Sequence, residues 1–168
     1  LGAIPDCVGP VLDALRILDL EIQSMPKQAG MEFAHLNANK YRGVATFSTH
    51  DMAPMRLWWE ENPERTQRYY ATMLQKDGRA PLKMPAFIAE EVIARHLYCP
   101  SMMCIMALQD WLAVDAGLHN PDTRAERINV PGSAFGGWSY RMHIDIERLV
   151  GDVKFNEKLK LMITRSRR

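Results

Sequence analysis

Apolar and polar positions in the first third of this chain follow two different periods. Apolar residues at helical spacing predict a helix over residues 5–17. Residues 20–25 alternate between apolar and polar side chains and predict a strand. A polar stretch without a clear period follows over residues 26–42 and predicts a loop. Residues 43–48 are a short apolar run of β-type residues and predict a second strand.

The helical period returns after the second strand. It begins at Pro54, and it begins again at Asn62, which suits an N-cap because Pro63 follows at the first helical position. Asp77-Gly78 predicts the end of this helix. A further helix is expected over residues 85–97.

A third apolar run covers residues 102–108 and has the length of a strand. A long loop rich in Gly, Pro, Asn and Asp is expected over residues 115–139, and a final amphipathic helix over residues 146–163. Because helical stretches separate the strands, the strands are expected to pair in parallel through crossover connections. The pattern therefore predicts an α/β fold with a small parallel sheet.

Polar side chains follow two of the predicted strands directly. His50 and Asp51 come after the second strand, and Gln109 and Asp110 come after the third. The carboxyl ends of parallel strands meet at one edge of a sheet, so these two pairs predict a site there. Asp51 equally suits the N-cap of the helix that begins near Pro54. His50 equally suits a buried, hydrogen-bonded histidine.

Composition narrows the function classes. The chain has 168 residues, of which 47% are apolar and 24% charged, with a net charge of +1. This charge provides no field that favours nucleic acid or a membrane surface, so neither is expected as a partner. Three sparse cysteines are typical of a reducing compartment, here the cytoplasm. The histidines and cysteines lack metal-ligand spacing, which argues against a metal site. The basic end, residues 165–168, is expected to be a solvated, fraying tail.

Several ordered motifs resemble one family, the 4-α-glucanotransferases (amylomaltase or disproportionating enzyme). The resemblance begins at Ser48-Thr49-His50-Asp51 and Trp58-Trp59-Glu60-Glu61. It continues at Leu1–Pro5, Leu20–Gln23, Leu108-Gln109-Asp110 and Arg127–Gly132, with Trp138 and Arg141 downstream. It implies a (β/α)8 TIM barrel, of which residues 1–168 would be a C-terminal fragment with about the last three strands. It also implies α-1,4-glucans and maltooligosaccharides, such as those of starch, glycogen and maltose metabolism, as substrates.

The resemblance also implies roles for named residues. Family members act by a retaining mechanism without a metal or organic cofactor, and Asp51 matches their third essential carboxylate. His50 is expected to hydrogen-bond the same sugar. The further residues expected to bind substrate and shape the mouth of the barrel are Gln109, Asp110, Arg127 and Asn129.

Two departures from the family pattern bear on function. Leu1 begins just after the expected acid/base glutamate, so that residue and the nucleophile are expected in an N-terminal remainder of the same polypeptide. The isolated chain is therefore expected to be inactive. Gly137 replaces the asparagine of the family's Asn-Trp pair, and Met52 stands where shorter members usually carry asparagine, so the preferred acceptor sugar is left open. A non-catalytic glycan-binding or structural remnant and an α-glucan hydrolase remain the alternatives.

Overall fold

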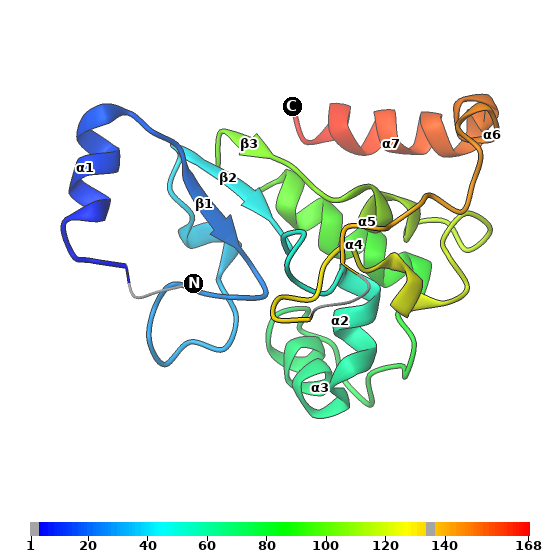
Figure 1. Ribbon diagram of the computed structural model, residues 1–168, viewed down its shortest axis with the longest axis horizontal. Coiled ribbons are helices and arrows are strands. Elements are labelled where there is room, and N and C mark those ends of the chain that lie inside the picture. The colour runs from blue at the N-terminus through cyan, green and yellow to red at the C-terminus, as the bar shows by residue number, and fades with distance from the viewer. Residues whose placement is uncertain (1–3, 134–136) are drawn as a thin grey trace.

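The computed structural model describes residues 4–133 and 137–168 and has a three-stranded parallel sheet at its centre (Figure 1). The strands are β1 (Asp19–Ile22), β2 (Gly43–Thr46) and β3 (Met103–Cys104), in the order β1-β2-β3. Asp19 lies opposite Gly43, and Val44 lies opposite Met103. The α/β class and the parallel pairing predicted from the sequence are therefore confirmed.

The central strand depends on a glycine. An added Cβ at Gly43 would lie 3.0 Å from the carbonyl oxygen of Lys40, so a side chain here would crowd the neighbouring backbone. The third strand is shorter than the apolar run predicted. After Cys104, the Ile105 amide still bonds the Ala45 carbonyl oxygen at 2.9 Å, and the chain then turns into a helix at Leu108.

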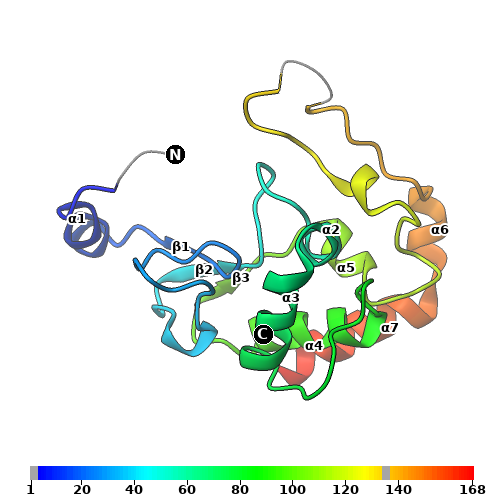
Figure 2. The same cartoon turned by 90° about the horizontal axis from the view of Figure 1, so that it is seen from below.

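Helices gather on one side of the sheet, while the first helix stands apart at the opposite end (Figures 1 and 2). The α-helices are α1 (Val8–Leu15), α2 (Met55–Glu61), α3 (Pro63–Thr72), α4 (Ala86–Leu97), α5 (Leu108–Leu112), α6 (Ile146–Gly151) and α7 (Val153–Arg165). Two 3-10 turns, Leu36–Ala38 and Thr123–Glu126, lie in the long connections. No helix of the described ranges has the length and apolar character needed to cross a membrane.

Capping residues decide where the helices begin and end. The Asn62 Oδ1 accepts a hydrogen bond from the Arg65 amide at 2.9 Å, which confirms the predicted N-cap of α3. That helix ends at Thr72, earlier than the predicted stop at Asp77-Gly78. The prediction of one final helix over residues 146–163 is also wrong, because the structure has two helices there. The Asp152 Oδ1 accepts from the Phe155 amide at 2.9 Å, and this cap starts α7 separately from α6.

An aromatic cluster fills the core between β2 and the helices. The Trp58 ring lies edge-to-face against Phe47 and Tyr69, with centroids 5.2 Å and 5.3 Å apart. Trp59 is fully buried, and its indole N–H donates to the Pro81 carbonyl at 2.8 Å. Both tryptophans therefore pack in the core and do not form an exposed platform for a sugar.

The predicted fraying tail is wrong for the last residue. The Arg168 guanidinium donates to the carbonyl oxygens of Cys99 and Ser101, each at 2.7 Å, and to that of Leu97 at 2.5 Å. These carbonyls belong to the last turn of α4 and the segment just beyond it. A helix C-terminus leaves carbonyls without intrahelical partners and carries partial negative charge. A cation is therefore stabilised there.

Candidate functional site

A pocket of about 250 Å³ lies at the carboxyl ends of β2 and β3. Its volume is below the range of roughly 300–1,000 Å³ that is typical of complete small-molecule sites. The described lining residues come from the turn after β2, the segment after β3 and one residue of the later loop: Thr46, Ser48, Thr49, His50, Met52, Pro54, Ile105, Met106, Ala107, Gln109 and Ile128. The turn after β2 and the loop around residues 127–133 rise on the same side of the molecule (Figure 2).

Asp51 lies in this turn and contacts two side chains. Its Oδ1 accepts a hydrogen bond from Asn129 Nδ2 at 2.7 Å and lies 3.5 Å from His50 Nε2. The helix-capping alternative is wrong, because the first amide of α2, that of Met55, donates to Asp110 Oδ1 at 2.8 Å. The Asp51 carboxylate is instead directed to the loop that faces the turn.

His50 is exposed, so the buried-histidine alternative is also wrong. Its side chain is 54% accessible, and its ring centroid lies 5.0 Å from that of Trp138. Trp138 is itself 66% exposed and has φ of 62°, a left-handed backbone conformation that is unusual for a bulky residue. The exposed His50 ring therefore stands beside the Asp51 carboxylate, with the exposed Trp138 ring next to it, and rings in such a position can contact a sugar.

Gln109 and Asp110 lie in α5 and bond to protein groups. Gln109 lines the pocket, and its Nε2 donates to the Glu126 carbonyl at 3.0 Å. Asp110 is 1% exposed, and its Oδ1 caps α2. Burial raises the pKa of Asp110 to about 6, opposed by the hydrogen bond from the Met55 amide. Asp110 therefore lies behind the pocket, while Gln109 forms part of its wall.

Arg127 and Asn129 are brought to the same place from the long loop. Arg127 Nη1 donates to Glu61 Oε1 on α2 at 3.0 Å, and Arg127 Nε donates to the Asn129 carbonyl at 3.1 Å. Arg127 thus connects α2 to the backbone of Asn129, whose side chain contacts Asp51. The structure brings Asp51, His50 and Asn129 into direct contact, and it places Arg127 one contact further away.

A buried ion pair that the sequence did not predict lies behind the site. Arg56 Nη1 lies 2.6 Å from Glu126 Oε1, and both side chains are almost fully buried. Burial raises the pKa of Glu126 to about 7, and the positive charge of Arg56 opposes that shift. An arginine within a run of buried α2 residues is the one local sign of this pair, and it does not identify the partner.

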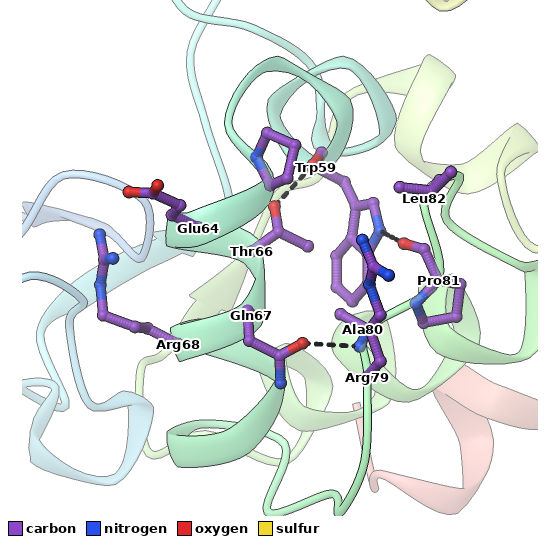
Figure 3. Close-up of a pocket in the computed structure, with 10 residues that line it drawn as sticks. Trp59, Glu64, Thr66, Gln67, Arg68, Arg79, Ala80, Pro81 and Leu82 are labelled. Carbon is purple, nitrogen blue, oxygen red and sulfur yellow. Dashed lines mark hydrogen bonds between the residues drawn. The ribbon is translucent and has the colours of Figure 1, made fainter.

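A second pocket, of about 440 Å³, lies between α3, Trp59 of α2 and the segment 79–82 (Figure 3). Trp59 and the segment Arg79–Leu82 form one side of it, and Gln67 on α3 forms the other. The Gln67 Oε1 accepts from the Ala80 amide at 2.8 Å, so the polar groups shown hold the 79–82 segment against the helix. The described lining includes none of the residues predicted for the site, and this pocket is a packing feature.

Metal-ligating side chains do not gather in the described ranges. Across residues 4–133 and 137–168, no three His, Cys, Asp or Glu side chains come close enough to hold a metal ion. The arrangement at the sheet edge is a carboxylate that contacts an amide and an imidazole, with an indole packed against the imidazole.

Comparison with known sequences identifies relatives over the whole chain. The family described as 4-alpha-glucanotransferase matches residues 1–146. The 4-alpha-glucanotransferase DPE2 of Oryza sativa subsp. japonica is 33% identical over 168 residues, which are 100% of this chain and 18% of the relative. A 4-alpha-glucanotransferase of Chlamydia muridarum is 28% identical over 95% of this chain and 30% of its own length. The chain thus spans less than a third of these relatives.

Comparison with solved structures shows a shared fold. An amylomaltase from Streptococcus agalactiae in complex with acarbose matches with a TM-score of 0.72 and 20% identity, covering 100% of this chain and 31% of that one. An amylomaltase from Corynebacterium glutamicum matches with a TM-score of 0.68 and 14% identity, covering 99% and 27%. Because the family match extends over residues 1–146 of 168, the chain belongs to the 4-alpha-glucanotransferase family.

Proposed function

We propose that this chain is the C-terminal part of the catalytic domain of a 4-α-glucanotransferase, which transfers a 1,4-α-glucan segment or a glucose unit to another sugar. The observation that carries the proposal is the position of the Asp51 carboxylate. It stands at the carboxyl end of β2, next to His50, and it does not cap the following helix. Catalytic carboxylates of α/β barrels stand at this end of the strands.

We propose further that residues 1–168 form part of a (β/α)8 barrel. In support, the three strands pair in parallel in chain order, as consecutive strands of a barrel do. Among the described residues, β1 and β3 each pair on one side alone, with β2. A long N-terminal remainder would pair with both edges and close the ring. The share of each relative that the chain covers, 18% and 30%, leaves ample length for it.

The proposed chemistry needs three carboxyl groups, one of which this chain supplies. A nucleophile from the remainder attacks the anomeric carbon, and an acid from the remainder protonates the departing glycosidic oxygen. The same acid/base then takes the proton of the acceptor's 4-hydroxyl as that oxygen displaces the nucleophile. Asp51 accepts hydrogen bonds from hydroxyls of the reacting sugar and stabilises the positive charge that develops on the ring. His50 donates to the same sugar.

The other four predicted residues act on the site in different ways. Gln109 forms part of the pocket wall, while Asp110 is buried and acts through the start of α2. Arg127 and Asn129 contact protein groups, so their proposed role is to shape the mouth of the site. The expected α-glucan substrate and cytoplasmic location remain part of the proposal. No cofactor is required for carboxylate-based transfer.

Redistribution of glucan length tests this proposal. The full-length polypeptide is incubated with maltotriose alone, and separately with maltose and glycogen, because a small sugar and a polymer are different acceptors. We expect products both longer and shorter than the donor in at least one mixture. Glucose and maltose alone, without longer products, would indicate a hydrolase. A protein that binds these glucans and leaves them unchanged would be a glycan-binding remnant.

The isolated chain of 168 residues is the matched comparison. It has one of the three proposed carboxylates, so we expect it to leave both mixtures unchanged at the same concentration. Clear redistribution by this chain alone would contradict the division of catalytic groups proposed above.

A further inference from the structure

We infer that Asn129 is a positioning residue for Asp51, and that the missing side chain at Gly137 makes this role possible. The inference rests on the proposed function, since it concerns the carboxylate proposed to act there. It departs from the role expected for Asn129 from the sequence, which was to bind the substrate directly.

The Asn129 amide bonds Asp51 at one end and lies against Gly137 at the other. Its Nδ2 donates to Asp51 Oδ1 at 2.7 Å, which leaves the Asn129 Oδ1 facing the opposite way. On that side lies the backbone of Gly137, where an added Cβ would be 2.5 Å from the Asn129 Oδ1. Real Cβ atoms do not approach an oxygen so closely. Any side chain at 137 would therefore displace the amide or be displaced by it.

The backbone around the amide is held as well. Arg127 Nε donates to the Asn129 carbonyl at 3.1 Å, and Arg127 itself bonds Glu61 of α2 at 3.0 Å. The Trp138 amide donates to the Ile128 carbonyl at 2.8 Å, which keeps Gly137 beside Asn129. The amide thus reaches Asp51 from a loop that is anchored to a helix.

This arrangement matters for a carboxylate on a turn. Asp51 lies beyond the end of β2, where the ladder no longer fixes its direction. A hydrogen bond to a charged acceptor is stronger than one between neutral groups, and it orients the acceptor. Within residues 4–133 and 137–168, the side-chain contacts of Asp51 are those of Asn129 and His50 with Oδ1, so we expect Oδ2 to be the oxygen that meets a sugar hydroxyl. Asn129 therefore sets the orientation in which Asp51 meets the substrate.

A double-mutant cycle in the full-length polypeptide tests the inference, with the redistribution assay as readout. We expect Asn129→Ala to lower kcat by about 10- to 100-fold, the scale for losing a hydrogen bond to a charged group, with a change in KM below about threefold. Gly137→Ala should lower kcat in the same way, because its methyl group displaces the amide. The double variant should be no slower than Asn129→Ala, because alanine at 129 has no side-chain amide for the methyl group at 137 to displace.

Two further variants separate positioning from a general loss of structure. Gly151→Ala adds a methyl group where no atom lies within 4 Å, and it should leave kcat and the thermal midpoint unchanged. Asn129→Asp keeps the shape of the side chain and places a second carboxylate against Asp51, so it should be slower than Asn129→Ala. If Asn129→Ala lowers the thermal midpoint, Asn129→Ser replaces it in the cycle, because its shorter polar side chain does not reach Asp51.

The outcomes are distinct. The inference would be overturned if the double variant lost kcat by the product of the two single-variant losses. A normal kcat in Asn129→Ala would overturn it as well. A rise in KM at unchanged kcat would return Asn129 to direct substrate binding and would also overturn it. A wild-type polypeptide that redistributes neither glucan mixture would refute the proposed function itself, and this result does not depend on any variant.

Discussion

Arg56 on α2 and Glu126 at the end of the second 3-10 turn form a buried ion pair, with Arg56 Nη1 2.6 Å from Glu126 Oε1. They are 70 positions apart in the chain. The same guanidinium nitrogen donates to the Asn120 carbonyl at 2.7 Å. Arg56 thereby holds both ends of the 120–126 segment against α2, and Arg127 and Asn129 follow directly from it.

Replacing Arg56 alone should destabilise the protein strongly. Arg56→Met leaves the Glu126 carboxylate buried without its cation, and such a change costs about 3–5 kcal/mol. The double variant Arg56→Met with Glu126→Leu should recover much of this loss, because no buried charge remains. Thermal unfolding of the full-length polypeptide at pH 8 measures both. A double variant that is less stable than the single one would contradict this account.

Asp110 predicts a pH-dependent stability. Its pKa is raised by burial from 3.8 to about 6, and its Oδ2 is a buried atom without a hydrogen-bond partner among the described residues. Between these pH values the folded protein holds the proton more tightly than the unfolded chain. The contribution of Asp110 to the free energy of unfolding is therefore fully present below pH 3.8 and is lost as the pH rises through about 6. Its maximum is about 3 kcal/mol.

Comparison with Asp110→Asn measures this effect, together with a change in the same direction at Glu126, whose pKa the Asp110 charge also raises. Burial lowers the pKa of His96 and of His119 to about 4, which makes acid destabilising and opposes the contribution of Asp110. The histidines contribute equally to both proteins, so their effect cancels in the difference. The asparagine still accepts from the Met55 amide and does not titrate. We expect the thermal midpoint of the wild type, measured relative to that of Asp110→Asn, to rise as the pH is lowered from 8 to 5. A constant difference would show that Asp110 does not titrate in this range.

Asp51→Asn in the full-length polypeptide should lower turnover by about 10²-fold or more, the scale for losing a preorganised electrostatic group. The amide has nearly the shape of the carboxylate but lacks the negative charge that stabilises the sugar in the transition state. Initial rates of glucan redistribution provide the measurement. Asp77→Asn, at an exposed position in the loop after α3, is the matched control and should be normal. Near-normal turnover of Asp51→Asn would remove this residue from the mechanism.

Trp138 is expected to support a sugar ring beside His50. It is 66% exposed, and aromatic contacts are worth about 0.5–1.5 kcal/mol, so Trp138→Ala should raise the KM for the acceptor by roughly 2- to 10-fold. Trp138→Phe should restore part of the loss. Tyr41→Ala removes a similarly exposed ring, 68% accessible, outside the described lining of the pocket, and should leave KM unchanged. An equal effect of Tyr41→Ala would argue against a specific contact.

Local sequence rules worked where short-range contacts decide the structure. Asn62-Pro63 started α3 as predicted, because an N-cap bond joins residues three apart. The same rule offered Asp51 as a cap for α2 and missed Asp110, which supplies the cap from 55 positions away. The third strand was too long in the prediction, because an apolar run of strand length is equally compatible with a turn into α5.

The order of strands and helices, the parallel sheet and the family motifs followed from the sequence by itself. Periodicity and capping are short-range properties, and ordered motifs identify a family without coordinates. Tertiary structure alone decided which polar groups meet. It paired Asp51 with Asn129, 78 positions away, placed Gly137 against that amide, and buried Asp110 behind the pocket. Contacts between segments so far apart depend on how the loops cross the sheet edge, and the long loop that carries Asn129 has no hydrophobic period from which that crossing can be predicted.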